Sequence, residues 1–344
     1  MKFEDILEIK NGRNQRAVEN PRGKYPIYGS GGIMGYADDY ICDAYTVIIG
    51  RKGNINNPIF VEEPFWNVDT AFGLSANTDV ILPRFLYYFC KKFDFERLNK
   101  TVTIPSLTKS DLLKIEIEPP NLLQQRDIVE RLTKIERIIA LRKLELKLLD
   151  ELIRARFVEM FGDIRYEEKY QGIPLRRLCT TISGGTPSTK CSEYYEGNIP
   201  WISTVSLGPN YIDGSTAKGY ITQEAIDNSA TKLIPAGNIL FGTRVGVGKS
   251  SINDVALCIN QDIVAIVGID KNRFNVLFIK YVLDTYQSYY DSIKKGATIL
   301  GITGDDLKNT LIPVPPLELQ NQFADFVKVV DKSKFTKTFR PLRC

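Results

Sequence analysis

The chain of 344 residues contains no histidine. This absence excludes the Ser-His-Asp and Cys-His arrangements of nucleophilic enzymes, histidine zinc sites and histidine general bases. Carboxylate and lysine chemistry stay open. However, no paired carboxylates, metal-ligand cluster or nucleophile–base pair stand out in the sequence.

Three further features are missing. The six cysteines form no Cys-x-x-Cys pair, no apolar run approaches a membrane span, and Met1–Asp5 lacks the apolar core of a secretory signal. These absences predict reduced thiols and a cytoplasmic location. The net charge is only +4, and residues 321–344, with six Lys or Arg and two Asp, account for all of it. Any binding to DNA must therefore depend on local basic patches.

One long helix is predicted at residues 121–161. Pro119-Pro120 precede it, Asn121 with Gln124 is typical of a helix start, and Gly162 follows its end. At about 1.5 Å per residue it is roughly 60 Å long. Alternating spacings of four and three residues define a seam of ten positions, eight of them apolar: Ile128, Leu132, Ile135, Ile139, Arg142, Leu146, Leu149, Ile153, Arg156 and Met160. Such a stripe predicts a coiled coil with a partner helix. An ordinary long helix lying on a domain is the alternative.

The sequence repeats itself on either side of this helix. Seven segments recur in the same order: 3–12 with 175–184, 25–28 with 199–202, 47–53 with 239–246, 67–69 with 260–262, 85–88 with 278–281, 107–112 with 302–307, and 119–124 with 315–320. The second copy has 19 extra residues around Tyr211–Ser229. The chain is therefore predicted to contain two copies of one domain, each followed by a helix.

The predicted fold class is α+β, with two similar mixed α/β domains joined by long coiled-coil-forming helices. The expected boundaries are residues 1–120 for the first domain, 121–162 for the first long helix, 163–316 for the second domain, and 317–344 for a shorter second helix and tail. Strands are expected at Thr46–Ile49, Asn238–Phe241 and Ile263–Val267, and helices near Arg84–Leu98 and Val276–Ser292. Asp305 is expected to cap a helix start, with Asp306 as its neighbour.

The repeat resembles the specificity subunit of Type I restriction–modification systems. The resemblance lies in Pro174-Leu175, in Gly184–Ser188, in the segment Tyr194–Ile202 and in the Pro-Pro-x-x-x-Gln motif ahead of each helix. It covers nearly the whole chain. It implies two target-recognition domains, 1–120 and 163–316, that each read one half of a split double-stranded DNA target. It also implies that the chain is the non-catalytic subunit of a restriction endonuclease and DNA adenine methyltransferase complex.

The resemblance implies partners as well. In that family the two long helices form an antiparallel coiled coil that sets the half-site spacing and docks two methyltransferase (modification) subunits. Restriction/motor subunits complete the complex. The docking candidates are the apolar seam positions Ile128, Leu132, Ile135, Ile139, Leu146, Leu149 and Ile153. No cofactor is expected in this chain, whereas S-adenosylmethionine, ATP and Mg are expected on the partner subunits.

The chain departs from that family in its second helix, which is expected to run only from Gln320 to about Arg340, before Pro341. This is about half the length of the first helix. A working specificity subunit with a short helix and a truncated, silent one that serves as a recombination reservoir are both open. A coiled-coil adaptor that binds only protein is a third possibility, which salt-sensitive DNA binding would exclude.

Five basic residues are the candidate DNA contacts: Arg51, Lys52, Arg244, Lys249 and Lys190. The first four lie in glycine-rich segments, and Arg or Lys on such turns can hold phosphate or guanine. Ordinary solvated surface charge is the alternative for each of them. Thr243–Ser250 also resembles a phosphate-binding P-loop with a misplaced first glycine. A nucleotide-binding enzyme that uses the Gly242–Ser250 loop is therefore the alternative function.

Asp69 and Asp262 are matched in the repeat, each two residues after an asparagine. A carboxylate can accept a hydrogen bond from cytosine N4, but a position retained in both copies favours a structural role. Base-reading residues are expected where the copies disagree, at Asn11–Gly35 outside the matched Tyr25–Tyr28, at Lys190–Glu196 and at Ser203–Lys218.

Overall fold

The computed structural model describes residues 1–101, 104–164, 169–296 and 298–338. The chain divides into two compact units, Met1–Lys143 (unit 1) and Leu144–Cys344 (unit 2), which are described separately. Helix α4 (Leu122–Phe161) contributes its first part to unit 1 and its last part to unit 2. Within the described ranges, no helix is long and apolar enough to cross a membrane.

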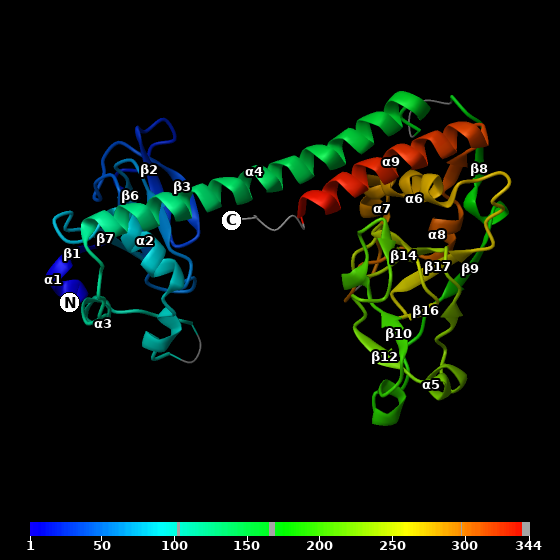
Figure 1. The fold of residues 1–344 in the computed structure, drawn as a ribbon, viewed down its shortest axis with the longest axis horizontal. Coiled ribbons are helices and arrows are strands. Elements are labelled where there is room, and N and C mark those ends of the chain that lie inside the picture. Colours follow the sequence, from blue (N-terminus) through cyan, green and yellow to red (C-terminus); the bar gives the residue numbers. More distant parts are fainter. Residues whose placement is uncertain (102–103, 165–168, 297, 339–344) are drawn as a thin grey trace. The chain divides into compact units, whose positions relative to one another are not determined.

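Unit 1 contains two small sheets (Figure 1). The larger is antiparallel with the order β1-β7-β4-β5, and the smaller has the order β3-β2-β6 with β2 parallel to β6. The strands are β1 (Leu7–Asn11), β2 (Tyr25–Gly29), β3 (Gly32–Ala37), β4 (Thr46–Gly50), β5 (Ile59–Val61), β6 (Trp66–Asn67) and β7 (Ala71–Ala76). The helices are α1 (Phe3–Ile6), α2 (Pro83–Lys92), the 3-10 helix η1 (Phe95–Leu98) and α3 (Lys109–Leu113), followed by α4.

Strand β4 is buried on both faces of its sheet, so that unit 1 has a hydrophobic cluster on each side of it. All five of its residues are buried. Val47 and Ile49 face the core that α2 covers, whereas Ile48 faces a second cluster on the other side of the sheet. Since alternate side chains point to opposite faces of a strand, an unbroken apolar run is what a strand covered on both faces requires.

Unit 2 contains three sheets, with the orders β11-β15-β14-β17-β9, β12-β10-β16-β13 and β18-β8. The strands are β8 (Gly172–Pro174), β9 (Thr180–Ser183), β10 (Ile199–Ile202), β11 (Tyr211–Ile212), β12 (Gly219–Ile221), β13 (Leu233–Ile234), β14 (Ile239–Gly242), β15 (Ser250–Asn253), β16 (Leu257–Ile259), β17 (Ile263–Val267) and β18 (Leu311–Pro313). The helices after α4 are η2 (Leu175–Arg177), η3 (Ser192–Tyr195), η4 (Thr204–Ser206), α5 (Gln223–Asp227), α6 (Val276–Thr285), α7 (Gln287–Ile293), α8 (Gly304–Lys308) and α9 (Leu317–Thr338).

The two units share one topology. Without β11, β13 and the separate pair β18-β8, unit 2 has the orders β9-β17-β14-β15 and β12-β10-β16. These match the two sheets of unit 1 in order and in strand direction. The predicted α+β class and the internal repeat are confirmed. The extra residues of unit 2 lie in two connections, 203–218 before β12 and 222–238 after it. The predicted insertion at Tyr211–Ser229 covers part of each.

The predicted strands are present, but each predicted helical stretch is two helices. In unit 1, α2 ends at Lys92, and Asp94 caps η1 by accepting a hydrogen bond from the Glu96 N–H (3.1 Å). In unit 2, α6 and α7 are separated at Tyr286. Each stretch is divided because Asp94 and Tyr286, which lie between the helices, have non-helical backbone angles.

Threonines, not aspartates, cap the short helices α3 and α8. The Thr303 hydroxyl accepts from the Asp306 N–H (3.1 Å), and the Asp306 carboxylate accepts from the Thr303 N–H (2.8 Å). The predicted cap at Asp305 is therefore wrong by two residues. Thr108 caps α3 in the same way, by accepting from the Asp111 N–H (3.1 Å), so this start is shared by both units.

Backbone hydrogen bonds fix the register of the repeat. Four hydrogen bonds from a backbone N–H to a backbone carbonyl recur in the two units. In unit 1 they run from Val68 to Tyr28, from Gly12 to Ala71, from Arg13 to Asn67 and from Arg51 to Thr70. Their counterparts in unit 2, in the same order, run from Asn260 to Ile202, from Gly184 to Ile263, from Gly185 to Ile259 and from Thr243 to Asp262. Residues 67–71 thus correspond to residues 259–263, a difference of 192 positions, whereas the sequence letters indicate 193. The predicted pairing of Asp69 with Asp262 is therefore wrong by one residue. Asp69 corresponds to Gln261, and Thr70 to Asp262.

A fully buried glutamine ties the start of each long helix to its unit. The side chain of Gln125 accepts from the Leu82 N–H (2.8 Å) and donates to Val80 O (2.9 Å) and Pro120 O (2.8 Å). Each of these backbone groups precedes α2 or α4, so one side chain joins two helix starts. Asn121 caps α4 by accepting from the Gln124 N–H (2.9 Å), as predicted.

Gln320 repeats the arrangement in unit 2. It accepts from the Asn275 N–H (2.9 Å) and donates to Arg273 O (3.1 Å) and Pro315 O (2.8 Å). Its counterpart is Gln125. The predicted match between Gln124 and Gln320 is wrong by one residue, and the side chain of Gln124 is exposed.

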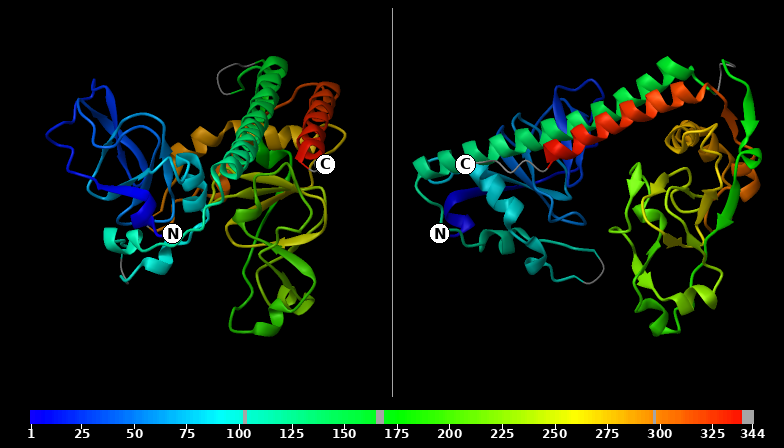
Figure 2. Two further views of the ribbon diagram at one scale, coloured as in Figure 1. Left: turned by 60° about the vertical axis from the view of Figure 1, so that its left-hand side comes forward. Right: turned by 45° about the vertical axis from the view of Figure 1, so that its right-hand side comes forward.

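The end of α4 packs against α9 in unit 2 (Figures 1 and 2). The rings of Phe161 and Phe323 lie 5.7 Å apart, and Lys334 pairs with Asp150 at 2.7 Å. Position numbers rise along α9 as they fall along α4, so the helices are antiparallel. Gly162, at φ +80°, ends α4 as predicted. The predicted end of the second helix at Arg340 and Pro341 lies outside the described residues.

Replacing Gln125 tests the joint at the helix start. Gln125→Ala leaves the partly buried Leu82 N–H and two carbonyls without their partner, which is expected to lower the free energy of unfolding by about 1–3 kcal/mol. Urea unfolding of the full chain measures this. Gln124→Ala is the matched control, with an expected change within about 0.5 kcal/mol. Equal effects of the two variants would contradict the assignment.

Candidate nucleic-acid interface

In unit 1 the loop between β6 and β7, residues 68–70, is fastened along its backbone. Three N–H groups bind carbonyls in or beside it: Gly12 to Ala71 O (3.2 Å), Arg13 to Asn67 O (2.8 Å) and Arg51 to Thr70 O (2.7 Å). A Cβ at Gly12 would lie 1.8 Å from Val68 O, so only glycine permits this approach. The side chains of Asp69 and Thr70 are exposed on this loop.

The loop between β16 and β17, residues 260–262, is fastened in the same way in unit 2. The donors are Gly184 to Ile263 O (3.1 Å), Gly185 to Ile259 O (3.0 Å) and Thr243 to Asp262 O (2.8 Å). A Cβ at Gly184 would lie 2.0 Å from Asn260 O, which again requires glycine. The exposed side chain here is Gln261. We call residues 68–70 and 260–262 the paired loops.

The polar side chains of the paired loops have different partners. Asp262 is half-buried, accepts a hydrogen bond from the Asn260 amide (3.2 Å) and lies 4.0 Å from the Arg244 guanidinium. The Gln261 carbonyl oxygen accepts from the Thr186 hydroxyl. Among the described residues, no donor reaches the Asp69 carboxylate. Asp262 thus belongs to the scaffold, whereas Asp69 and Gln261 are presented to solvent.

Three of the five predicted DNA contacts lie next to the paired loops. Arg51 and Lys52 follow β4, and Arg244 follows β14. Because the Arg51 N–H and the Thr243 N–H bind corresponding carbonyls, Lys52 corresponds to Arg244. Both of these side chains are exposed. The structure therefore brings one basic side chain to the same place in each unit. The sequence repeat alone matches Arg244 with Arg51, one residue before Lys52.

The other two predicted contacts lie elsewhere. The carbonyl of Lys249 accepts the Gly242 N–H (2.9 Å) at the base of the β14–β15 hairpin, and Lys249 lines a cavity whose lining does not include Asp262. Lys190 lies in an exposed turn before η3. No contact in the described part of the chain links either of them to Arg244.

Comparison with known proteins identifies the family. A family model described as the Type I restriction modification DNA specificity domain matches residues 1–151 and 167–339. The chain belongs to this family. Two similar relatives are the MjaIX specificity subunit of Methanocaldococcus jannaschii, 32% identical over 46% of this chain, and the EcoR124I/EcoR124II specificity subunit of Escherichia coli, 35% identical over 43% of it. Each match spans only 37% of the relative's own length.

The fold agrees with this family. The crystal structure of a Type I restriction–modification S subunit from M. genitalium has a TM-score of 0.63 with 17% sequence identity, covering 98% of this chain and 90% of that one. At this identity the likeness concerns the fold alone. It extends over both units and both long helices, so the specificity-domain family accounts for the whole architecture.

The glycine-rich segment of this specificity-domain protein is not a nucleotide loop. A P-loop joins a strand to the start of a helix, so that backbone N–H groups and the helix dipole face the phosphates. Here residues 243–249 join the antiparallel strands β14 and β15. The alternative of a nucleotide-binding enzyme that uses Gly242–Ser250 is therefore not favoured. Gly248 has a φ of +87°, a backbone conformation that favours glycine, so it serves the turn of the hairpin.

The predicted seam of α4 divides into three parts. Ile128 and Leu132 are half-buried in unit 1. Ile135, Ile139 and Leu146 are 40–49% exposed. In unit 2, Leu149 packs against the core and Ile153 is buried within it. Ile153 is therefore occupied by contacts within the chain, whereas the middle of the seam is open to solvent together with Ile138, Leu141, Leu144, Leu148 and Leu152.

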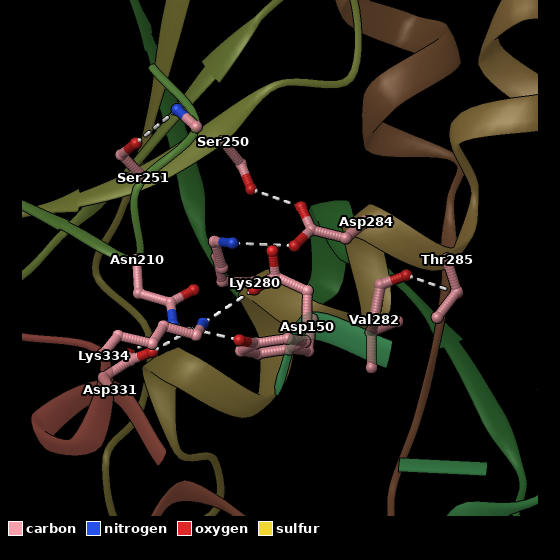
Figure 3. Close-up of polar contacts among 12 residues, drawn as sticks. Asp150, Asn210, Ser250, Ser251, Lys280, Val282, Asp284, Thr285, Asp331 and Lys334 are labelled. Carbon is pink, nitrogen blue, oxygen red and sulfur yellow. Dashed lines mark hydrogen bonds and ion pairs between the residues drawn. The ribbon is translucent and has the colours of Figure 1, made fainter. Parts of the chain in front are cut away.

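A network of charged side chains in unit 2 ties an inserted connection to the helices (Figure 3). It lines an open cavity of about 1420 Å³. The Asn210 amide, in the connection 203–218, donates to Asp331 on α9 (2.7 Å) and to the Tyr281 hydroxyl on α6 (2.9 Å). Lys334 pairs with Asp331 and with Asp150 of α4.

Two pKa shifts follow from this network. Burial lowers the pKa of Lys334, but its hydrogen bonds to Asp150 and Asp331 outweigh burial, so the pKa is raised above its ordinary value. Burial raises the pKa of Tyr281, so the hydroxyl stays neutral. The network therefore keeps a charged lysine and a neutral tyrosine through the physiological pH range.

The pair Lys280–Asp284 is the most buried part of the network. The Lys280 side chain is 5% exposed and lies 2.7 Å from Asp284, which also accepts from the Ser250 hydroxyl (2.7 Å). Asp284→Ala strands the buried ammonium and is expected to lower the free energy of unfolding by about 3 kcal/mol. The double variant Lys280→Met/Asp284→Ala removes both charges and is expected to lose less.

Chemical unfolding of the full chain compares the two variants. Asp305→Ala, in a pair with Lys308 whose carboxylate is 88% exposed, is the control and should change stability by less than about 1 kcal/mol. A double variant that is no more stable than Asp284→Ala alone would show that Lys280 does not depend on this partner.

Proposed function

We propose that the chain is the DNA sequence-recognition subunit of a Type I restriction–modification complex, with each unit reading one half of a split target. The observation that carries the proposal is the repeat. Two units with the same strand order fasten the same loop by the same backbone bonds, yet expose different side chains on it. A common scaffold with different exposed side chains suits two half-sites of different sequence. The DNA specificity family of the chain supports DNA as the ligand.

The proposed mechanism divides the work among three parts. Exposed polar side chains on loops read base edges, because base edges carry the sequence information. Basic side chains beside those loops hold phosphates and fix the register on the duplex. Helix α4, which is continuous from one unit into the other, sets the separation of the half-sites.

The chain acts in this proposal without chemistry of its own. Methyltransferase subunits dock on the long helices, and the exposed apolar residues in the middle of α4 are their candidate contact. Restriction/motor subunits join through the complex. S-adenosylmethionine, ATP and Mg belong to these partners, and the complex works in the cytoplasm. A structural relative from work on complex assembly of the type I R-M system, with a TM-score of 0.54, supports partner subunits in general.

Methylation mapping tests the proposal. Genomic DNA is sequenced from cells that carry the methyltransferase subunit with and without this chain. A new split motif that appears only with the chain is the expected result. No new motif, despite a stable complex with the methyltransferase, would favour a silent specificity subunit, and the absence of any complex would contradict the subunit role.

Lys52 and Arg244 are expected to hold phosphates. Because phosphate contacts carry no sequence information, Lys52→Ala and Arg244→Ala should weaken binding to all duplexes alike. Each change should also reduce the slope of log K against log salt by about 0.9, the release of one counterion. Titration of labelled duplexes at several salt concentrations measures both effects.

Two exposed lysines away from the paired loops serve as controls for that titration. Lys92→Ala, at the end of α2, matches the unit 1 variant, and Lys271→Ala matches the unit 2 variant. An unchanged salt slope for Lys52→Ala and Arg244→Ala, or an equal loss for the controls, would contradict the phosphate role.

A further inference from the structure

We propose that Asp69 and Gln261 are equivalent base-reading residues, one for each half of the target; this rests on the proposed function of DNA recognition. The sequence letters match Asp69 with Asp262, and a residue retained in both copies favours a scaffold role. The backbone register reverses that conclusion. Asp69 corresponds to Gln261, so the two copies disagree at an exposed polar position.

The paired loops have the geometry that readout requires. A base contact is selective only if the side chain is held in place, since a mobile side chain adapts to several bases. Three backbone N–H groups fasten each loop, and a glycine in each unit permits the close approach of the neighbouring strand. The same backbone hydrogen bonds therefore hold both loops, and the side chain that is exposed in both units differs, Asp69 in unit 1 and Gln261 in unit 2.

The chemistry of the two side chains predicts different bases. Asp69 is an acceptor only, and among the described residues it has no donor, so it suits a base that presents an amino group, such as cytosine N4. Gln261 has both an acceptor and a donor and suits adenine, which presents N6 and N7. The Thr186 hydroxyl occupies one lone pair of the Gln261 oxygen and leaves the other available. Thr186 thereby orients the amide.

The residues around Asp69 and Gln261 are suited to phosphate contacts or to scaffold roles, and not to base contacts. Lys52 and Arg244 stand at corresponding places beside the paired loops, and a basic residue retained in both units suits phosphate, which every sequence shares. Asp262 is engaged by Asn260 and Arg244 within the unit. Thr70 is exposed, but its counterpart Asp262 is half-buried, so the pair Asp69 and Gln261 is the one that is exposed in both units and differs in chemistry.

Substitution at these positions should change one half of the target each. The full chain, in complex with its methyltransferase subunit, selects from a random duplex library, and the bound DNA is sequenced. Asp69→Ala is expected to relax selection at one base pair in one half of the motif by roughly five- to a hundred-fold. Gln261→Ala is expected to do so in the other half. The exchange variants Asp69→Gln and Gln261→Asp should shift the preferred base at those same positions.

Matched controls are Asp79→Ala in unit 1 and Gln223→Ala in unit 2, which alter the same side-chain types away from the paired loops. Thermal unfolding of each variant verifies that it is folded. A split motif in the unaltered complex that is unchanged in all four variants at 69 and 261 would overturn the base-reading assignment and leave the proposed function intact. A random selection by the unaltered complex would overturn the proposed function itself.

Discussion

The buried glutamine at the start of each long helix is the contact on which the arrangement of each unit depends. Gln125 and Gln320 are inaccessible to solvent, and each satisfies three backbone groups that no secondary structure would otherwise pair. A buried polar side chain is tolerated only when its donors and acceptors are matched in position and direction. The amide therefore specifies where the long helix leaves its unit, and the same solution occurs twice in one chain.

Much of the architecture can be predicted from the sequence. The long helix, its cap at Asn121, its end at Gly162 and the repeat are carried by residue types and spacing, which act locally. The main errors concern register. The sequence pattern favours Gln124 over Gln125 and matches Asp69 with Asp262, because neighbouring letters of the same kind conceal which one carries the hydrogen bonds. The direction of a side chain is set by the folded backbone, and a shift of one residue along a helix turns it by about 100°, from the exposed Gln124 to the buried Gln125.

The candidate site could be predicted from the sequence less completely than the fold. The basic residues Arg51, Lys52 and Arg244 are visible in the sequence as charges in glycine-rich turns, but their proximity to the paired loops is not. The glycines that fasten those loops, Gly12 and Gly184, are visible only as ends of repeated segments. Their role depends on the carbonyls of Val68 and Asn260, 56 and 76 positions further along the chain, a distance over which local spacing carries no information.

The inserted connection of unit 2 has a practical consequence for exchanging specificity. Asn210 is bonded to Tyr281 on α6 and to Asp331 on α9, and Lys334 of α9 reaches Asp150 on α4. A graft that carried only the sheets of unit 2 would sever these bonds and strand their charges. The transferable module therefore begins within α4, ahead of Asp150, and extends through α9. A crossover at that point in α4 preserves the bond between Lys334 and Asp150, whereas a crossover at the end of α4 would break it.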